Sequence, residues 1–315
     1  MTGMNVVISI DVGGTGLKCA LVDTEHQVRH TERHPTGVQR GLPAVLATIL
    51  DTAESLAATA VRAGWQPIAA GVVVPGIVDE TNGIASYSSN VGFRDTPLRE
   101  LVHERLGLPI AVGHDVRAGG LAEARLGAGR GRSQVLVMPI GTGIAAAHVV
   151  DGVVATGAHG AAGEIGHIVV RPSGPLCGCG LRGCLEAVAS ASAVERRYTE
   201  LSGEMATAAQ VAGRLGRDVH ADQVWAETVD ALADGLLTGQ ALYDPELVII
   251  GGGLAESGEA LLGPLRDAMA KKVTFHRVPE FLKAQLGDEA GSLGAALMAL
   301  ALHDRQAAAT SEEPR

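Results

Sequence analysis

Residues 163–186 read GEIGHIVVRPSGPLCGCGLRGCLE and hold three of the four cysteines of the chain. These are Cys177, Cys179 and Cys184, and His167 precedes them in the same stretch. Three thiolates and one imidazole form the ligand set of a closed, tetrahedral zinc site. The glycines between the cysteines suit a loop that turns tightly around an ion. The stretch therefore predicts a structural zinc site in a loop spanning residues 163–186.

Two other interpretations of the cysteines are weaker. Three unrelated buried thiols would have no reason to cluster and to alternate with glycine. A disulfide would leave one of the three thiols over. In addition, the N-terminal sequence MTGMNVVISID lacks the charged start and the long apolar run of a secretion signal.

The same stretch resembles the signature of the ROK family of bacterial sugar kinases and related repressors. The resemblance lies in E-x-G-H at residues 164–167 and in C-x-C-G-x-x-G-C-x-E at residues 177–186. In that family the histidine and the three cysteines bind zinc, so the resemblance implies the same ligands here. It also implies that Glu164, His167 and Glu186 contact the hydroxyls of a hexose.

Composition and charge narrow the class of protein further. The 315 residues are enough for one large or two medium domains with buried cores. Hydrophobic residues make up 46% and aromatic residues only 3%, which favours tightly packed helices and strands. The net charge of −10 argues against a nucleic-acid surface. We see no apolar run of about 18 residues, the length of a membrane span, and therefore expect a cytoplasmic protein.

A glycine-rich turn follows the first predicted strand, residues 5–10. It reads DVGGTG at residues 11–16, and a second strand is predicted at residues 18–22. The turn can be an ordinary hairpin turn, but exposed amides in such a turn can also approach a phosphate. Asp11 favours the second interpretation, because a carboxylate beside such amides suits a Mg²⁺ site.

Two more glycine turns follow predicted strands in the second half of the chain. Residues 141–143, Gly-Thr-Gly, separate strands predicted at residues 133–140 and 145–150. A branched side chain at Gly143 would block backbone approach to a phosphate. Residues 251–253 are three glycines between a predicted strand and a predicted helix. They suit a position beneath an adenine or an α-phosphate, and a simple strand-to-helix loop is the alternative.

Asp115 lies where a strand predicted at residues 108–112 meets a helix predicted at residues 116–126. Ligands of α/β proteins bind at the carboxyl ends of such strands. The matching residue of ROK kinases takes the proton from the sugar hydroxyl, and a helix N-cap is the alternative role. The family usually has asparagine before this aspartate, and that asparagine binds a sugar hydroxyl. Here His114 takes its place, and Arg117 also departs from the family pattern.

Each half of the chain begins with strand, glycine turn and strand and continues into helices and strands. This α/β pattern predicts two domains that face each other across an active-site cleft. It resembles the actin- and hexokinase-like (ribonuclease H-like) fold, in which two such turns hold the phosphates of ATP. We expect a small domain at residues 1–113, completed by a C-terminal helix at about 291–303, and a large domain at residues 114–290. Residues 304–315 are expected to form a disordered tail.

The resemblance implies ligands for each substrate. ATP and Mg²⁺ would be bound by Asp11, Gly13, Gly14, Thr15, Gly16, Lys18, Gly141, Thr142, Gly143, Gly251, Gly252 and Gly253. The hexose would be bound by Gly76, Asn90, His114, Asp115, Glu164, His167 and Glu186. Asp115 would act as the general base, and His167, Cys177, Cys179 and Cys184 would hold the structural zinc.

The leading hypothesis is an ATP- and Mg²⁺-dependent hexose kinase, a glucokinase that makes glucose 6-phosphate. A kinase for N-acetylmannosamine, N-acetylglucosamine or fructose is one alternative, and a sensor that binds hexose without turnover is another. Polyphosphate users share the fold, so the phosphate donor is also open. Few residues precede the first strand, so we do not expect the DNA-binding domain of the repressor branch. ROK proteins are commonly dimers or tetramers, so we expect a homo-oligomer, with neither nucleic acid nor membrane as a partner.

Overall fold

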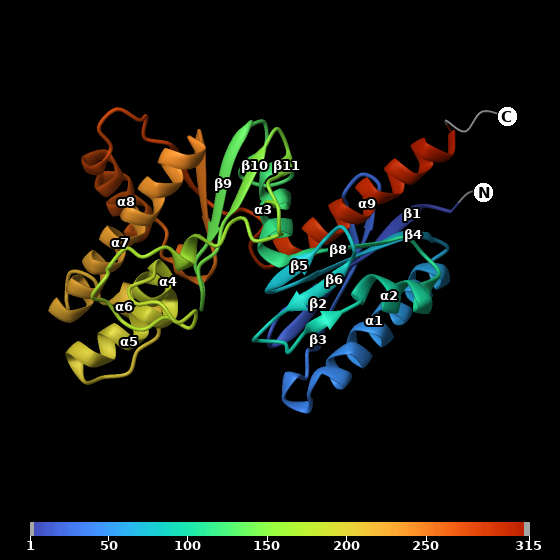
Figure 1. Ribbon diagram of the computed structural model, residues 1–315, viewed down its shortest axis with the longest axis horizontal. Helices are drawn as coiled ribbons and strands as arrows, with labels where there is room; N and C mark the ends of the chain where they lie inside the picture. Colours follow the sequence, from blue (N-terminus) through green and yellow to red (C-terminus); the bar gives the residue numbers. More distant parts are fainter. Residues whose placement is uncertain (1–2, 312–315) are drawn as a thin grey trace. The chain divides into compact units, whose positions relative to one another are not determined.

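A computed structural model describes residues 3–311 of the chain, shown as a ribbon in Figure 1. Contacts divide the chain into two compact units. Unit 1 comprises Met1–Ala122, Thr156–Ala161 and Asp288–Arg315. Unit 2 comprises Glu123–Ala155 and Ala162–Gly287. The predicted domain boundary lies between residues 113 and 114. The observed boundary lies instead between Ala122 and Glu123, inside a helix, and Thr156–Ala161 belong to unit 1 again.

Unit 1 is built on a five-stranded sheet with the strand order β3-β2-β1-β4-β8. The strands are β1 (Asn5–Val12), β2 (Gly16–Asp23), β3 (Val28–Pro35), β4 (Gln66–Val74) and β8 (Ile110–His114). β1, β4 and β8 run parallel, whereas β2 is antiparallel to both β1 and β3. The parallel strands are apolar almost throughout, as is usual where both faces of a sheet are covered.

Helices cover both faces of this sheet. On one face, Val72 and Val74 pack with α1 (Leu42–Arg62) and α2 (Leu98–Leu106). On the other face, Val73 packs against α9 (Ala290–Ser311). The alternation follows from the two-residue period of a strand. Among the described residues, α1 alone is long and apolar enough to cross a membrane, but its apolar side forms part of this core.

A small antiparallel sheet lies between β4 and α2. Its strands are β5 (Ile77–Asp79), β6 (Ile84–Tyr87) and β7 (Arg94–Thr96). These strands are short and rich in polar residues, so they carry no apolar alternation that could reveal them.

Unit 2 has a sheet of the same design, with the order β11-β10-β9-β12-β13. Its strands are β9 (Gln134–Pro139), β10 (Ala147–Val150), β11 (Val153–Val154), β12 (Leu247–Gly251) and β13 (Glu280–Lys283). β9, β12 and β13 run parallel, and β10 and β11 form the antiparallel edge. The strand order and directions therefore repeat those of unit 1.

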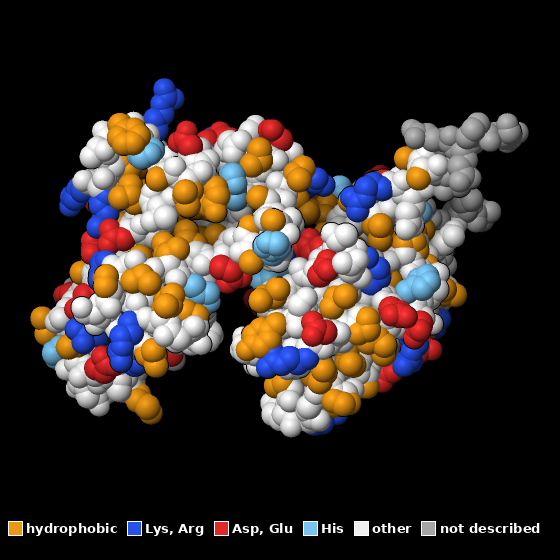
Figure 2. Space-filling model, in the orientation of Figure 1, with side chains coloured by type: hydrophobic (Ala, Val, Ile, Leu, Met, Phe, Trp, Pro, Cys, Tyr) orange, Lys and Arg blue, Asp and Glu red, His pale blue; other side chains and the backbone are white. Residues whose placement is uncertain are grey.

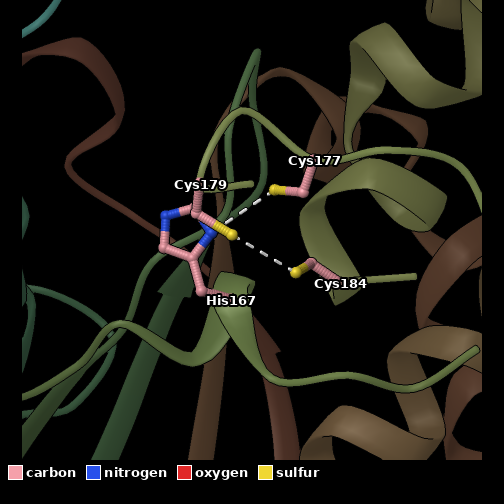
Figure 3. Close-up of side chains that lie close together, drawn as sticks. All are labelled: His167, Cys177, Cys179 and Cys184. Atoms are coloured by element: carbon pink, nitrogen blue, oxygen red, sulfur yellow. Dashed lines mark hydrogen bonds between the residues drawn. The ribbon is translucent and has the colours of Figure 1, made fainter. Parts of the chain in front are cut away.

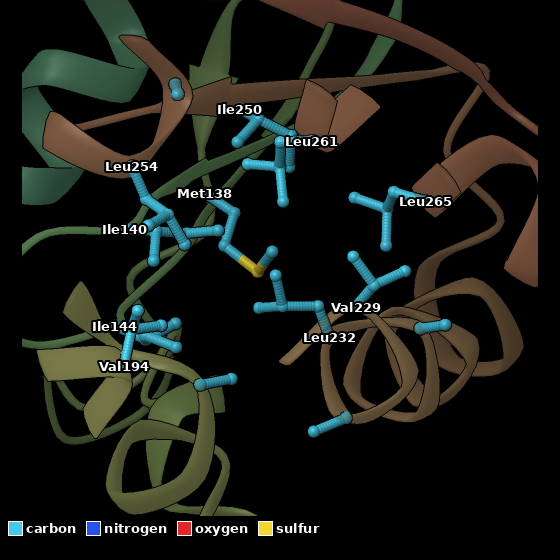
Figure 4. Close-up of a cluster of buried hydrophobic side chains, with 14 of the residues drawn as sticks. Met138, Ile140, Ile144, Val194, Val229, Leu232, Ile250, Leu254, Leu261 and Leu265 are labelled. Carbon is cyan, nitrogen blue, oxygen red and sulfur yellow. The ribbon is translucent and has the colours of Figure 1, made fainter. Parts of the chain in front are cut away.

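The helices of unit 2 enclose its main core. They are α4 (Leu185–Ala189), α5 (Ala191–Ser202), α6 (Ala208–Gly213), α7 (Val219–Tyr243) and α8 (Glu259–Lys272). Figure 4 shows side chains from the sheet, from these helices and from the segments that follow β9 and β12 meeting in this core, among them Met138, Ile140, Ile144, Val194, Val229, Leu232, Ile250, Leu254, Leu261 and Leu265. Figure 2 shows Lys and Arg interspersed with Asp and Glu over the visible surface.

The end of the chain differs from the sequence-based expectation. The last helix continues to Ser311, so the predicted disordered tail is wrong for residues 304–311. Alanines at residues 307–309 are strong helix formers and extend α9 beyond its packed part. Residues 312–315, also part of the predicted tail, lie outside the described residues.

Candidate functional site

The four predicted zinc ligands come together in unit 2. Figure 3 shows the thiols of Cys177, Cys179 and Cys184 and the ring of His167 turned toward one another. Their ligand atoms all lie within 4.8 Å of one another. The Sγ of Cys177 is 3.6 Å from Nδ1 of His167, and the Sγ atoms of Cys179 and Cys184 are also 3.6 Å apart. Sulfurs bound to tetrahedral zinc at about 2.3 Å would be separated by about 3.8 Å, so the arrangement fits this ion.

The electrostatics of the thiols also favour a cation. Burial, with the neighbouring thiols, raises the pKa of Cys184 to about 12. The pKa of Cys179 is lowered instead, chiefly by a backbone hydrogen bond at Leu181. Three thiolates this close repel one another unless a divalent ion neutralises them, and such an ion deprotonates its thiol ligands. The cluster is therefore suited to bind zinc as thiolates.

The backbone of the loop is fixed at a glycine. Gly183 has a φ of +71°, and a Cβ there would lie 1.4 Å from the carbonyl oxygen of Arg171. The amides of Val170 and Arg171 both donate to the carbonyl of Gly183, at 2.9 and 3.0 Å. The loop closes so tightly at this point that only glycine fits.

His167 connects the cysteine cluster to the first predicted sugar-binding carboxylate. Its Nδ1 faces the thiols, while its Nε2 lies 3.8 Å from Oε2 of Glu164. His167 ends the short 3-10 helix η2 (Ile165–His167), for which Glu164 is the N-cap residue. A metal-bound histidine is commonly oriented by a carboxylate at its other nitrogen. The metal cluster and Glu164 thus share one structural element.

Glu186 connects the cluster to the second glycine turn. It follows Cys184 by two residues, on α4, and its Oε2 accepts a hydrogen bond from the amide of Ile144 at 3.0 Å. A Cβ at Gly143 would lie 2.6 Å from the same oxygen. Gly143 is therefore glycine because the Glu186 carboxylate occupies the space beside it. No local pattern in the sequence predicts this contact, because the two residues lie 43 positions apart.

The two glycine turns of unit 2 lie side by side at the carboxyl ends of β9 and β12. The amide of Ile140 donates to the carbonyl of Gly251 at 2.9 Å, and the amide of Leu254 donates to the carbonyl of Ile140 at 3.0 Å. Gly252 has a φ of +74°, and a Cβ there would lie 2.5 Å from the Ile140 oxygen. In contrast, a Cβ at Gly141 or Gly253 would meet nothing within 4 Å. These two glycines leave the backbone open to a ligand.

The first glycine turn, in unit 1, is held by a hydrogen bond within the turn and by another from a residue outside it. The amide of Gly13 donates to the carbonyl of Gly16 at 2.9 Å, and the buried Thr36 hydroxyl donates to the carbonyl of Gly13 at 2.6 Å. Lys18 forms an ion pair with Asp288 at 3.3 Å. Asp288 was not predicted from the sequence, and Lys18 would have to share its charge between this partner and a phosphate.

Asp11 lies near the end of β1, at the carboxyl edge of the parallel strands of unit 1. Burial, followed by the negative charge of Asp115, raises the pKa of Asp11 to about 7, and Lys18 offsets part of this shift. A Cβ at Gly291, at the start of α9, would lie 2.3 Å from Oδ2 of Asp11. A carboxylate that is this costly to ionise suits a site that is completed by a cation.

Asp115 begins the helix α3 (Asp115–Arg125), directly after β8. Its side chain is 27% exposed, and its Oδ1 accepts from the amide of Val116 at 2.7 Å. An N-cap accepts instead from an amide two or three residues further on. Here Nδ1 of the buried His114 accepts from the amide of Arg117 at 3.4 Å. The N-cap alternative for Asp115 is therefore not supported by its hydrogen bonds.

Gly76 and Asn90 belong to the same unit. Gly76 has a φ of +102°, and a Cβ there would lie 2.1 Å from the carbonyl oxygen of Tyr87. Asn90 is exposed in the turn between β6 and β7. Its Cβ lies 3.9 Å from the position that a Cβ at Gly14 would take. Asn90 therefore lies beside the first glycine turn.

The predicted residues thus form one set in each unit. In unit 1 these are Asp11, Gly13, Gly14, Thr15, Gly16, Lys18, Gly76, Asn90, His114 and Asp115. In unit 2 they are Gly141, Thr142, Gly143, Glu164, His167, Cys177, Cys179, Cys184, Glu186, Gly251, Gly252 and Gly253.

Fold and site together define a member of the actin- and hexokinase-like α/β proteins, with a cysteine-rich loop in unit 2 whose side chains could hold a metal ion. Residues 7–302 match the model of the ROK family. The chain is 35% identical over 309 residues to a glucokinase of Thermotoga maritima, covering 92% of this chain and 96% of the relative. A glucokinase of Streptomyces coelicolor is 31% identical, with 94% and 98% covered.

Solved structures of ROK proteins have the same fold as this chain. A ROK hexokinase from Thermus thermophilus matches with a TM-score of 0.82 and 32% identity, covering 96% of this chain and 99% of the other. A ROK family glucokinase from Streptomyces griseus, in complex with glucose and AMPPNP, matches with a TM-score of 0.79 and 29% identity, covering 93% and 99%. The chain belongs to the ROK family.

We expect the purified protein to contain about one zinc ion per chain, held by the four clustered ligands. Cys179→Ser should lose the zinc and also weaken hexose binding, because the loop carries Glu164 and Glu186. Elemental analysis and calorimetry with hexose measure the two effects. Cys19→Ala, which removes the one cysteine outside the cluster, serves as the control and should keep its zinc. A zinc-free wild-type protein with full activity would contradict the assignment.

Gly143→Ala should weaken hexose binding as well as ATP binding. The sequence alone predicts that a branched side chain here weakens ATP binding far more than hexose binding, but even the Cβ of alanine would lie 2.6 Å from Glu186 Oε2 and displace this carboxylate. We expect the dissociation constant for hexose, measured without nucleotide, to rise on the order of tenfold, the scale of an overpacked contact. Gly141→Ala, whose Cβ has open space, is the matched control and should leave hexose binding unchanged. Unaltered hexose affinity in Gly143→Ala would disprove the role given to this contact.

Asp11→Asn should stabilise the fold at pH 8 while it abolishes metal-dependent turnover. The folded-state pKa of Asp11 is about 7, above the ordinary value of 3.8, so ionisation of this residue destabilises the folded protein as pH rises from about 4 to about 7. The variant should therefore be more stable than wild type by roughly 1–2 kcal/mol above pH 7, after solvent screening is allowed for, and equally stable near pH 4. Urea unfolding at the two pH values tests this, and a difference independent of pH would refute it.

Proposed function

We propose that this sugar kinase is a glucokinase that transfers the γ-phosphoryl group of ATP to the 6-hydroxyl of glucose. The observation that carries the proposal is the Asp115 carboxylate. It is partly exposed, lies at the carboxyl end of β8 and does not cap its own helix. A second carboxylate, Asp11, is close enough to feel its charge. Such a pair provides one group to take a proton and one to hold a metal ion.

Asp115 is the general base of the proposed reaction. Phosphoryl transfer requires alignment, neutralisation of charge and a group that accepts the proton of the attacking hydroxyl. Oδ1 of Asp115 is fixed by the amide of Val116. The carboxylate is 27% exposed, and its Oδ2 would accept the proton of the sugar hydroxyl. The neighbouring His114 would bind a second hydroxyl, with a ring held by the amide of Arg117.

The open glycine backbones and Asp11 would hold the nucleotide. Amides of the first turn, residues 13–16, and of residues 141–143 would bind the phosphates, and residues 251–253 would lie beneath the adenosine. Asp11 would hold Mg²⁺ through water, and the ion would neutralise the phosphate charge. The raised pKa of Asp11 supports this role, since a cation would relieve the cost of ionising this buried carboxylate.

The sugar clamp of the proposal comes from the zinc loop. Glu164, His167 and Glu186 would accept and donate hydrogen bonds to the hydroxyls, together with Gly76 and Asn90 of unit 1. The zinc would act only as a structural support, because all four ligand positions are taken by protein atoms. A sugar lacking a matching hydroxyl would leave a carboxylate unpaired, which is how such a site selects its substrate.

The identity of the sugar is the most specific part of the proposal. Relatives include an N-acetylgalactosamine kinase of Shewanella, 32% identical, and an N-acetylmannosamine kinase of Citrobacter koseri, 31% identical. His114, in place of the usual asparagine, is the specific feature that favours testing such sugars. Turnover with ATP should be measured over glucose, fructose, N-acetylglucosamine and N-acetylmannosamine. Polyphosphate should be tested as a donor, and we place the enzyme in the cytoplasm as a homo-oligomer.

Asp115→Asn should keep hexose binding within a modest factor and lower kcat by at least about 100-fold, the usual effect of losing a general base. Asparagine preserves shape and hydrogen bonding, so thermal stability should change little. Asp218→Asn is a suitable control, because Asp218 is a true N-cap that accepts from the amides of His220 and Ala221. This control should turn over like wild type. A normal kcat in Asp115→Asn would end the proposed mechanism, and absence of turnover with every sugar would favour a sensor.

A further inference from the structure

We propose that Arg117 is a positioning residue that sets the place of Glu164 and thereby controls the affinity for the sugar. The inference rests on the proposed role of Glu164 as a sugar ligand. Arg117 stands two residues after Asp115 on α3 and is only 3% exposed. A buried guanidinium is costly unless it is fully paired, so its partners indicate what it holds.

The guanidinium of Arg117 bridges two separate segments of unit 1. Its Nε and Nη2 donate to Oε1 of Glu80 at 3.0 and 2.7 Å. Its Nη1 donates to the carbonyl oxygen of Gly160 at 2.9 Å. Glu80 follows β5, whereas Gly160 lies in Thr156–Ala161, the short segment that leaves unit 2 and joins unit 1. One side chain thus ties this segment to the helix that begins at the proposed base.

Gly160 is confined from its other side as well. Its φ is +68°, and a Cβ there would lie 2.5 Å from the carbonyl oxygen of Val78 on β5. The segment therefore lies against β5 while Arg117 holds its carbonyl. Neither contact leaves room for the backbone of Gly160 to shift without breaking a hydrogen bond or meeting a carbonyl oxygen.

Glu164 follows Gly160 by only four residues, so the position of Gly160 restricts the position of Glu164. After Ala161 the chain enters unit 2, where Gly163 is anchored in turn. The carbonyl of Gly163 accepts from the amide of Ala146 at 2.7 Å and from the amide of Ile165 at 2.8 Å. Only residues 161 and 162 separate the two anchored glycines, and this span is at most about 11 Å. Glu164 is the next residue, so the tether to Arg117 limits where its carboxylate lies.

Arginine is required for this bridge. Its planar fork presents donors in two directions, so it can bind a carboxylate and a carbonyl at the same time, whereas a lysine ammonium is a single point charge. The amide of Arg117 also donates to His114 Nδ1. The same residue thereby fixes the histidine beside the proposed base and the loop that leads to Glu164. A purely structural ion pair would contribute to stability without any selective effect on the sugar.

Arg117→Lys is the central test, since it keeps the charge and most of the volume. We expect the KM for hexose to rise about tenfold, the scale of a lost hydrogen bond to a charged group, with the KM for ATP within about twofold of wild type. Gly160→Ala, which displaces the same segment without touching α3, should act in the same direction. Arg125→Lys is the matched control. It is an arginine of the same helix that donates to the carbonyl of Gly152 at 2.9 Å, and it should leave both constants unchanged.

A double variant separates this inference from the proposed function. If Arg117 acts through Glu164, Arg117→Lys should add no further rise in hexose KM once Glu164→Gln is present. Full additivity of the two changes, or a loss of thermal stability in Arg117→Lys with a normal hexose KM, would overturn the inference. A normal hexose KM in Glu164→Gln alone would instead overturn the proposed sugar clamp, and the inference with it.

Discussion

The close approach of three cysteines and one histidine is the constraint on which the proposed sugar clamp depends. The two ends of the loop of residues 163–186 pack into the core of unit 2 through Ile165 and Leu185, whereas residues 171–182 are mostly exposed and need another means of fixation. Four ligand atoms within 4.8 Å of one another provide that fixation once a cation balances their charge. Glu164 and Glu186 flank these ligands in sequence, so under the proposed function a bound zinc ion would also fix the positions of the two carboxylates.

The sheets of the two units have the same strand order and directions, yet the two hairpin turns differ chemically. In unit 1 the turn follows a carboxylate, Asp11, whose ionisation is opposed by burial and by Asp115. In unit 2 the corresponding turn lies against the Glu186 carboxylate, and its neighbour is a second, uncharged glycine turn. Under the proposed function, the same sheet topology thus provides a metal-binding turn in unit 1 and two nucleotide-binding glycine turns in unit 2.

Much of this arrangement could be predicted from the sequence, because it depends on local signals. Buried parallel strands appear as apolar runs, turns appear as glycines, and the cysteine spacing points to a metal. β3 escaped prediction because its residues VRHTERHP alternate between polar types at the edge of the sheet. The bridge from Arg117 to Glu80 and Gly160 escaped because its partners lie 37 and 43 residues away in sequence. The contact between Gly143 and Glu186 is equally non-local, and only the folded backbone reveals it.

The discontinuity of unit 1 has a consequence for synthesis on the ribosome. α9, the last helix, covers one face of the central strands β1 and β4 of unit 1, and Gly71 on β4 approaches the carbonyl of Ala295 so closely that a Cβ there would lie 2.0 Å from it. Every residue of unit 2 is therefore translated before the first sheet can be covered. The nascent chain carries an open apolar sheet face until α9 emerges, so unit 1 begins to be made before unit 2 but is completed after it.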